Sequence, residues 1–154
     1  MEIYLVQHAE SKSKEEDPER PLTDEGFGNI DKIASYARKH IAISLRTIIH
    51  SGKLRARRTA EALAGYLEPT EGISESDGLE PMADPSIWAE RISKSEKDIM
   101  LVGHLPHLAK LAGVLLSGDE TKNVIGFQNA GIVKLIRDAD DNWRIDWIIV
   151  PSIV

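Results

Sequence analysis

Two apolar runs that each end in a histidine constrain the fold of this chain most strongly. Residues 3–6, IYLV, lead directly into Gln7 and His8, and residues 98–104, DIMLVGH, end in His104. Apolar, partly β-branched runs of this length are typical of strands buried on both faces, as in parallel sheets. We therefore predict two buried strands that carry histidines at their carboxyl ends.

The sequence between these runs alternates between helix and strand patterns. Residues 9–22 are polar and predict a loop, and Thr23 is a suitable N-cap for the helix that follows. Residues 45–50, LRTIIH, predict a strand, and residues 53–67 predict a helix. The apolar periodicity predicts that these two helices bury Ile30, Ile33, Ala34, Ala37, Ala56, Ala60, Leu63, Ala64 and Leu67.

The second half of the chain continues the same alternation. Residues 68–83 are rich in turn formers and leave their secondary structure undecided, whereas Asp84 and Pro85 predict the start of a helix that runs to about Lys94. Residues 106–116 are helical in pattern. Residues 131–138 and 143–150 predict a terminal hairpin of exposed sheet-edge strands around the DADDN turn. This order of elements indicates an α/β fold with a mainly parallel sheet.

Composition narrows the classes of function. A chain of 154 residues without a flexible linker is expected to form one domain, residues 1–154. The absence of cysteine excludes disulfides and thiolate chemistry, and fits a cytoplasmic location. The net charge of -6 argues against nucleic-acid binding. No leader peptide and no run of 18 apolar residues is evident, so we expect no membrane association.

Polar groups gather where the predicted strands end. Ligands of α/β sheets bind outside the carboxyl ends of the strands, so Gln7 and His8, residues 51–55 and His104 should share one edge. A single histidine is more often a hydrogen-bonded structural residue than a ligand. We interpret His40, His50 and His107 in that way.

Five motifs, in order along residues 2–116, resemble those of the histidine phosphatase superfamily. They are LVQHAE (5–10), RPLTDEG (20–26), SGKLRARRTA (51–60, with Ser51, Arg55, Ala56 and Thr59), LEPMAD (79–84) and VGHLPHL (102–108). The short chain and LEPMAD resemble the compact SixA-type phosphohistidine phosphatases. The resemblance implies a phosphoglycerate-mutase-like fold, in which three α/β/α layers surround a mainly parallel sheet with a C-terminal antiparallel hairpin.

The resemblance also implies a mechanism. His8 would be the nucleophile and form a covalent phosphohistidine. Arg55 would hold two phosphoryl oxygens, His104 would donate to the oxygens that gain charge, and Gln7 and Ser51 would bind substrate. No metal or other cofactor is required. The implied substrates are phosphohistidine proteins or small phosphomonoesters.

Other candidate groups have simpler interpretations. HSGK lacks the earlier glycine of a phosphate-binding loop, and no H-x-x-x-H or HExxH pair indicates a metal. We interpret Arg57 and Arg58 as a solvated basic face. Glu80 lies near the position where larger relatives keep a proton-donating glutamate, but an exposed loop carboxylate is the simpler interpretation, and Glu10 is equally ambiguous.

Gln7 departs from the family pattern, which has arginine before the nucleophile; Ala9 stands where the family has glycine. Glutamine keeps hydrogen-bond donors but lacks the charge, and a charge-assisted hydrogen bond is roughly twice as strong as a neutral one. Two hypotheses follow. The protein is a phosphatase, or it is a phosphate- or phosphoprotein-binding module with weak or no turnover.

Overall fold

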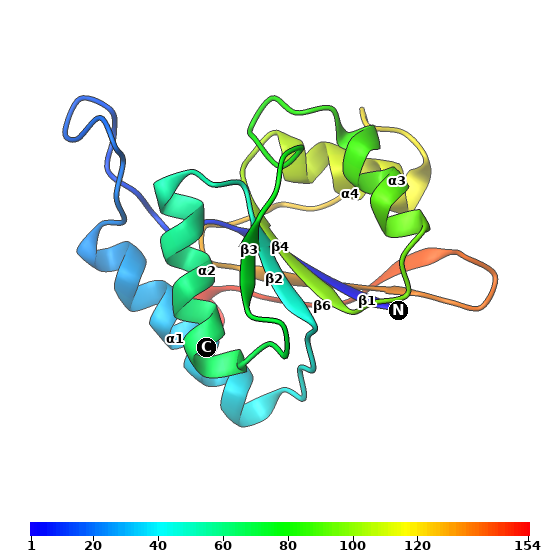
Figure 1. Ribbon diagram of the computed structural model, residues 1–154, viewed down its shortest axis with the longest axis horizontal. Coiled ribbons are helices and arrows are strands. Elements are labelled where there is room, and N and C mark those ends of the chain that lie inside the picture. Colours follow the sequence, from blue (N-terminus) through cyan, green and yellow to red (C-terminus); the bar gives the residue numbers. More distant parts are fainter.

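The computed structural model describes residues 1–154 (Figure 1). Its strands are β1 (Glu2–Gln7), β2 (Thr47–His50), β3 (Ile73–Glu75), β4 (Ile99–Gly103), β5 (Ile132–Arg137) and β6 (Trp143–Ile149). Its helices are α1 (Asp24–His40), α2 (Leu54–Leu67), α3 (Pro85–Ser93), α4 (His107–Ser117) and the short 3-10 helix η1 (Pro151–Ile153). None of the helices has the length and apolar character needed to cross a bilayer.

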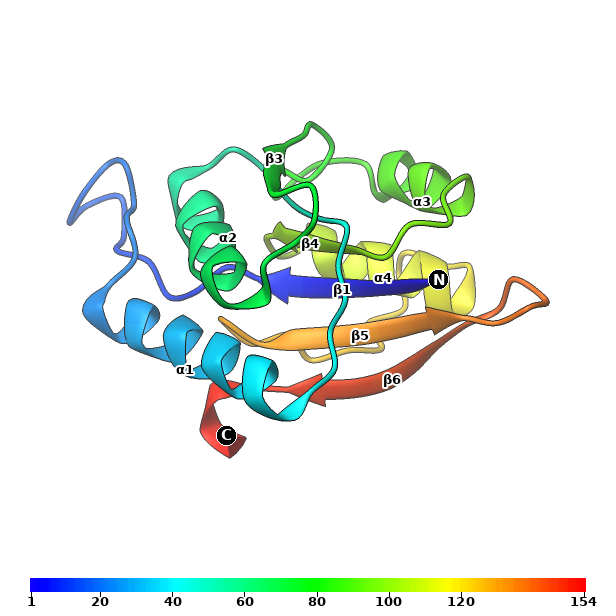
Figure 2. The same cartoon turned by 60° about the horizontal axis from the view of Figure 1, so that its bottom comes forward.

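The six strands form one sheet in the order β3-β2-β4-β1-β5-β6. The first four strands of this order are parallel to one another, β5 is antiparallel to β1, and β6 is antiparallel to β5. Helices α1 and α2 cover one face of the sheet, and α3 and α4 cover the other (Figure 2). The three-layer α/β/α architecture with a C-terminal antiparallel hairpin is therefore confirmed.

The register of the two central strands brings the predicted histidines together. Gln7 of β1 is aligned with Gly103 of β4, so the next residue of each strand, His8 and His104, leaves the sheet at the same level. The backbone N–H of His8 still donates to the Gly103 carbonyl at 3.1 Å. Alternating side chains of β1 pack into two separate apolar clusters, which fixes this register.

Both helix starts that carry a cap signal form as predicted. The Thr23 side chain accepts a hydrogen bond from the N–H of Gly26 at 2.9 Å, and the Asp84 side chain accepts one from Ser86 at 2.9 Å. Gly26 has a further reason to be glycine, because a Cβ at this position would overlap the Glu10 carbonyl oxygen. The loop after His8 is thus held against the start of α1.

Three details of the fold go beyond the sequence pattern or differ from it. Residues 68–83 contain β3, an edge strand of three exposed residues that has no apolar pattern to reveal it. Of the two hairpin strands, only β6 lies at a sheet edge, because β5 lies between β1 and β6. Ala64 packs against the core, as expected of an inward-facing residue, although it is only half-buried, and Thr59 is the fully buried residue that the apolar periodicity of α2 overlooked.

Candidate active site

His8 is buried directly after β1 and presents one unprotonated nitrogen. Its Nδ1 lies 2.7 Å from the carbonyl oxygen of Ala9, which only accepts hydrogen bonds, so Nδ1 carries the proton and Nε2 keeps its lone pair. Burial lowers the pKa of His8 to about 4, and the charges of Arg55 and Arg20 contribute in the same direction. The imidazole is therefore neutral, and potentially nucleophilic, at neutral pH.

His104 faces His8 from the end of β4. The two ring centroids are 5.1 Å apart, with an angle of 53° between the planes. His104 Nε2 lies 2.6 Å from the hydroxyl oxygen of Ser51, whereas its Nδ1 is buried without a hydrogen-bond partner. Burial lowers the pKa of His104 to about 3, and the neighbouring positive charge of Arg55 adds to this effect.

Arg55 supplies a cation that no protein anion neutralises. It lies in the first turn of α2, half-buried, and no carboxylate oxygen is within 4.0 Å of its guanidinium. Its Nε is buried without a hydrogen-bond partner, and burial, followed by the charge of Arg20, lowers its pKa. An unpaired guanidinium beside the positive end of a helix is suited to bind an oxyanion.

Thr59 joins the loop that carries His8 to the helix that carries Arg55. The N–H of Ala9 donates to Thr59 Oγ1 at 2.9 Å, and the same hydroxyl donates to the Arg55 carbonyl at 2.8 Å. Ala9 itself is fully buried. Thr59 belongs to the SGKLRARRTA motif, but the sequence pattern indicated no role for it.

Two more residues beside the site were missed. Asn129 Nδ2 donates to the His8 carbonyl at 2.8 Å, and no local pattern around it signals this contact. Arg20 is held on the loop before α1 by hydrogen bonds to the Lys12 carbonyl (3.0 Å) and to Ser11 Oγ (3.1 Å), and its charge acts on His8. Arg20 is the arginine of the RPLTDEG motif, which was the available signal.

Comparison with known proteins finds solved structures of the same fold. No family model matches the sequence. An uncharacterized protein of Picosynechococcus sp. is 32% identical over 143 residues, covering 88% of this chain and 84% of that protein. The protein histidine phosphatase SixA, complexed with tungstate, has a TM-score of 0.84 at 20% identity over 99% of this chain and 98% of its own. The alpha-ribazole phosphatase from Shigella flexneri has a TM-score of 0.79 at 11% identity over 98% of this chain and 97% of its own.

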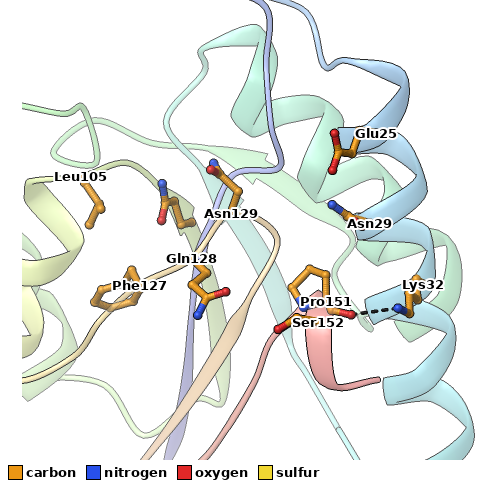
Figure 3. Close-up of a pocket in the computed structure, with 10 residues that line it drawn as sticks. Glu25, Asn29, Lys32, Leu105, Phe127, Gln128, Asn129, Pro151 and Ser152 are labelled. Carbon is orange, nitrogen blue, oxygen red and sulfur yellow. Dashed lines mark hydrogen bonds between the residues drawn. The ribbon is translucent and has the colours of Figure 1, made fainter.

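The chain has the fold of these phosphatases. Gln7 stands where the pattern that this sequence resembles has arginine before the first histidine. The Gln7 side chain forms no hydrogen bond, and its Oε1 is buried without a partner. Gln7 lines a pocket of about 650 Å³ between α1 and the segment that precedes β5 (Figure 3).

Three other residues of the SGKLRARRTA motif, Ser51, Arg57 and Arg58, have side chains that interact with neighbouring protein groups. Ser51 was expected to bind substrate. Its hydroxyl forms a hydrogen bond with the imidazole of His104, so Ser51 is placed to orient that ring. Arg57 and Arg58 both pair with Glu61 on an exposed face of α2, as the simpler interpretation predicted. The N–H of Lys53 donates to the Ser51 hydroxyl at 3.4 Å.

The two ambiguous carboxylates are each hydrogen-bonded. Glu80 is half-buried rather than fully exposed, and its Oε2 accepts a hydrogen bond from the N–H of Gly78 at 2.9 Å. Glu10 is exposed, and its Oε1 accepts a hydrogen bond from the Thr23 hydroxyl at 3.0 Å. No group of three or more histidine, aspartate or glutamate side chains is arranged to hold a metal ion.

The other three histidines differ in their surroundings from His8 and His104. His40 is exposed at the end of α1 beside Tyr36, and His50 Nδ1 accepts a hydrogen bond from the N–H of Gly52 at 3.0 Å. His107 was expected to be hydrogen-bonded, and this is wrong. Both of its ring nitrogens are buried without a partner.

Proposed function

We propose that this protein is a metal-independent phosphatase that works through a phosphohistidine intermediate on His8. One observation carries the proposal: the neutral, buried imidazole of His8 keeps its Nε2 lone pair free within the field of an unpaired Arg55. An imidazole in this state is a competent nucleophile at neutral pH, and a guanidinium fork binds two oxygens of a phosphoryl group.

The chain's own groups account for both halves of the reaction. Arg55, His104 and the first N–H groups of α2 would hold the phosphoryl oxygens while Nε2 of His8 attacks phosphorus. A nitrogen–phosphorus bond forms as the bond to the leaving group breaks, and the leaving group departs with the bonding electron pair and gains a proton. Water then attacks the phosphohistidine, which releases inorganic phosphate and restores His8.

The substrates proposed are phosphohistidine proteins or small phosphomonoesters. The first class is supported by the similarity to a protein histidine phosphatase, and the second by the similarity to an alpha-ribazole phosphatase. Both classes of substrate would present a dianionic phosphoryl group to His8, Arg55 and His104. They differ in the group that leaves.

Gln7 favours a second candidate function, that of a phosphate- or phosphoprotein-binding module. Loss of one transition-state donor typically costs on the order of 100- to 1000-fold in rate. A pocket without the family arginine therefore binds an oxyanion while turning it over slowly. Against this candidate, a binding module has no need of a neutral imidazole with a free Nε2.

Covalent trapping separates the two functions. With a ³²P-labelled aryl phosphate and a rapid denaturing quench, the wild type should form an acid-labile phosphoenzyme and release phosphate, in buffer with or without EDTA. His8→Asn should abolish both signals. His40→Asn, which changes an exposed histidine of α1, is the matched control and should retain them. Label that persists in His8→Asn contradicts the nucleophile, and binding without label or turnover establishes the second function.

A further inference from the structure

A pocket rich in amide side chains adjoins the proposed phosphoryl site. Four amides, Gln7, Asn29, Gln128 and Asn129, line the pocket of about 650 Å³, and we name it the amide pocket after them. Figure 3 shows Asn29 on α1 facing Gln128 and Asn129 across the opening. A volume of this size is in the range of small-molecule sites, which is about 300 to 1,000 Å³.

The amide pocket is joined to both histidines of the site. Gln7 immediately precedes His8, and Asn129 donates to the His8 carbonyl at 2.8 Å. Leu105, which also lines the pocket, immediately follows His104. A molecule whose phosphoryl group lies between the two histidines therefore has the amide pocket within reach of the rest of its structure.

The hydrogen-bonding groups of the pocket are largely unsatisfied. Asn129 uses its Nδ2 on the His8 carbonyl, which leaves its Oδ1 as an acceptor, and Gln7 Oε1 is buried without a partner. The side chains of Asn29 and Gln128 form no hydrogen bonds within the protein. Amides that both donate and accept match hydroxyl groups, which do the same.

The charges of the pocket do not favour a second anionic group. Glu25 and Lys32 are its only charged side chains, and they have opposite signs. Lys32 Nζ donates to the carbonyl of Pro151 at 2.9 Å, as the dashed line in Figure 3 marks, whereas Glu25 forms no ion pair. A carboxylate or a second phosphate would find one engaged cation and one repelling carboxylate.

We propose that the amide pocket binds the leaving group of the substrate, and that this group is neutral and rich in hydroxyls, as in a sugar or polyol phosphate. This inference rests on the proposed phosphatase function and narrows its substrate class to small phosphomonoesters. Gln7 then belongs to the recognition of the leaving group, which explains why an amide stands at this position.

Matched esters test the inference. Sorbitol 6-phosphate and n-hexyl phosphate both release a six-carbon primary alcohol, but only the first carries hydroxyls along its chain. Because a site that hydrogen-bonds hydroxyls strongly rejects an analogue without them, kcat/KM should be at least about 100-fold higher for sorbitol 6-phosphate. It should also exceed the values for 6-phosphogluconate and for a phosphohistidine peptide. Equal rates on the two matched esters, or a preference for the acidic ester or the peptide, would overturn the inference.

Two variants locate the preference in the amide pocket. Asn29→Ala and Gln128→Ala should each lower the ratio of the sorbitol 6-phosphate to the hexyl phosphate kcat/KM by about tenfold, the effect of one or two lost hydrogen bonds. Asn142→Ala is the control, because Asn142 is an exposed amide in the β5–β6 turn at the opposite end of the sheet. An unchanged ratio in both pocket variants contradicts the assignment. If an aryl phosphate is not hydrolysed and His8 is not labelled, the phosphatase function itself fails.

Discussion

Ser51 and His104 are joined by a hydrogen bond of 2.6 Å between the serine hydroxyl and Nε2 of the imidazole. The bond connects the end of β2 to the end of β4, and it is the only hydrogen bond that the His104 ring makes, because Nδ1 has no partner. The serine hydroxyl also accepts a hydrogen bond from the backbone N–H of Lys53. Ser51 thus sets the orientation of His104 before any phosphoryl group arrives.

Removing the Ser51 hydroxyl should impair catalysis, because His104 would lose the hydrogen bond that orients its ring. We expect Ser51→Ala to lower kcat by about 10- to 100-fold, less than the loss of a direct oxyanion donor. Ser51→Thr keeps the hydroxyl and should recover most of the activity. Steady-state kinetics of the two variants, with aryl phosphate as substrate, measure the effect. Equal rates in Ser51→Ala and the wild type would show that His104 needs no such support.

We expect the positive charge of Arg20 to contribute to the low pKa of His8. A nearby cation disfavours imidazolium, so Arg20→Gln should raise the pKa of His8 above the value of about 4 in the wild type. The neutral, nucleophilic form predominates above the pKa, so the acid limb of phosphoenzyme formation should move to higher pH. NMR titration of the His8 ring measures the shift. Arg57→Gln is the control, because Arg57 is engaged with Glu61 on the exposed face of α2.

We expect His107 to lower the free energy of unfolding, and to lower it further at acidic pH. Its two buried nitrogens lack partners, and burial lowers its pKa. Between the lowered pKa and the unfolded value of about 6.5, the unfolded chain binds the proton and the folded chain does not, so folding weakens as pH falls.

His107→Leu removes both penalties while keeping the site apolar. We expect the free energy of unfolding to rise by about 1 kcal/mol or more at pH 8, since an unsatisfied buried polar group costs about 1–3 kcal/mol. The gain should be larger at pH 5. Urea titrations at the two pH values provide the measurement. A variant that is less stable than the wild type at both values would mean that His107 has a favourable role in the core.

The sequence was sufficient for the parts of the structure that depend on local patterns. Apolar runs that end in His8 and His104 indicated two buried strands of a mainly parallel sheet, and the cap signals at Thr23 and Asp84 located two helix starts correctly. These features depend on residues close together in the chain. Their physical causes, alternation and capping, act within a few residues.

What could not be predicted depends on contacts between distant segments. The hydrogen bond from Asn129 to His8 spans 121 residues, and the amide pocket combines residues of β1, α1 and η1. The three exposed residues of β3 pair only because β2 presents an edge to them. The lack of hydrogen-bond partners for His107 is likewise a property of the packed interior, and the sequence around this residue gives no sign of it.

Gln7→Arg restores the charge that the family pattern has at this position. If residue 7 reaches the phosphoryl group, inorganic phosphate should bind about 1 to 2 kcal/mol more tightly, the difference between a charged and a neutral donor. Turnover of alkyl phosphates should rise, and turnover of phosphohistidine should rise less, because its leaving group departs readily. Calorimetry at fixed ionic strength measures the binding. Gln128→Arg, which adds the same charge on the pocket rim, controls for long-range attraction. If the two variants bind phosphate equally, or if a folded Gln7→Arg binds it no better than the wild type, residue 7 faces the leaving group and does not contact the phosphate.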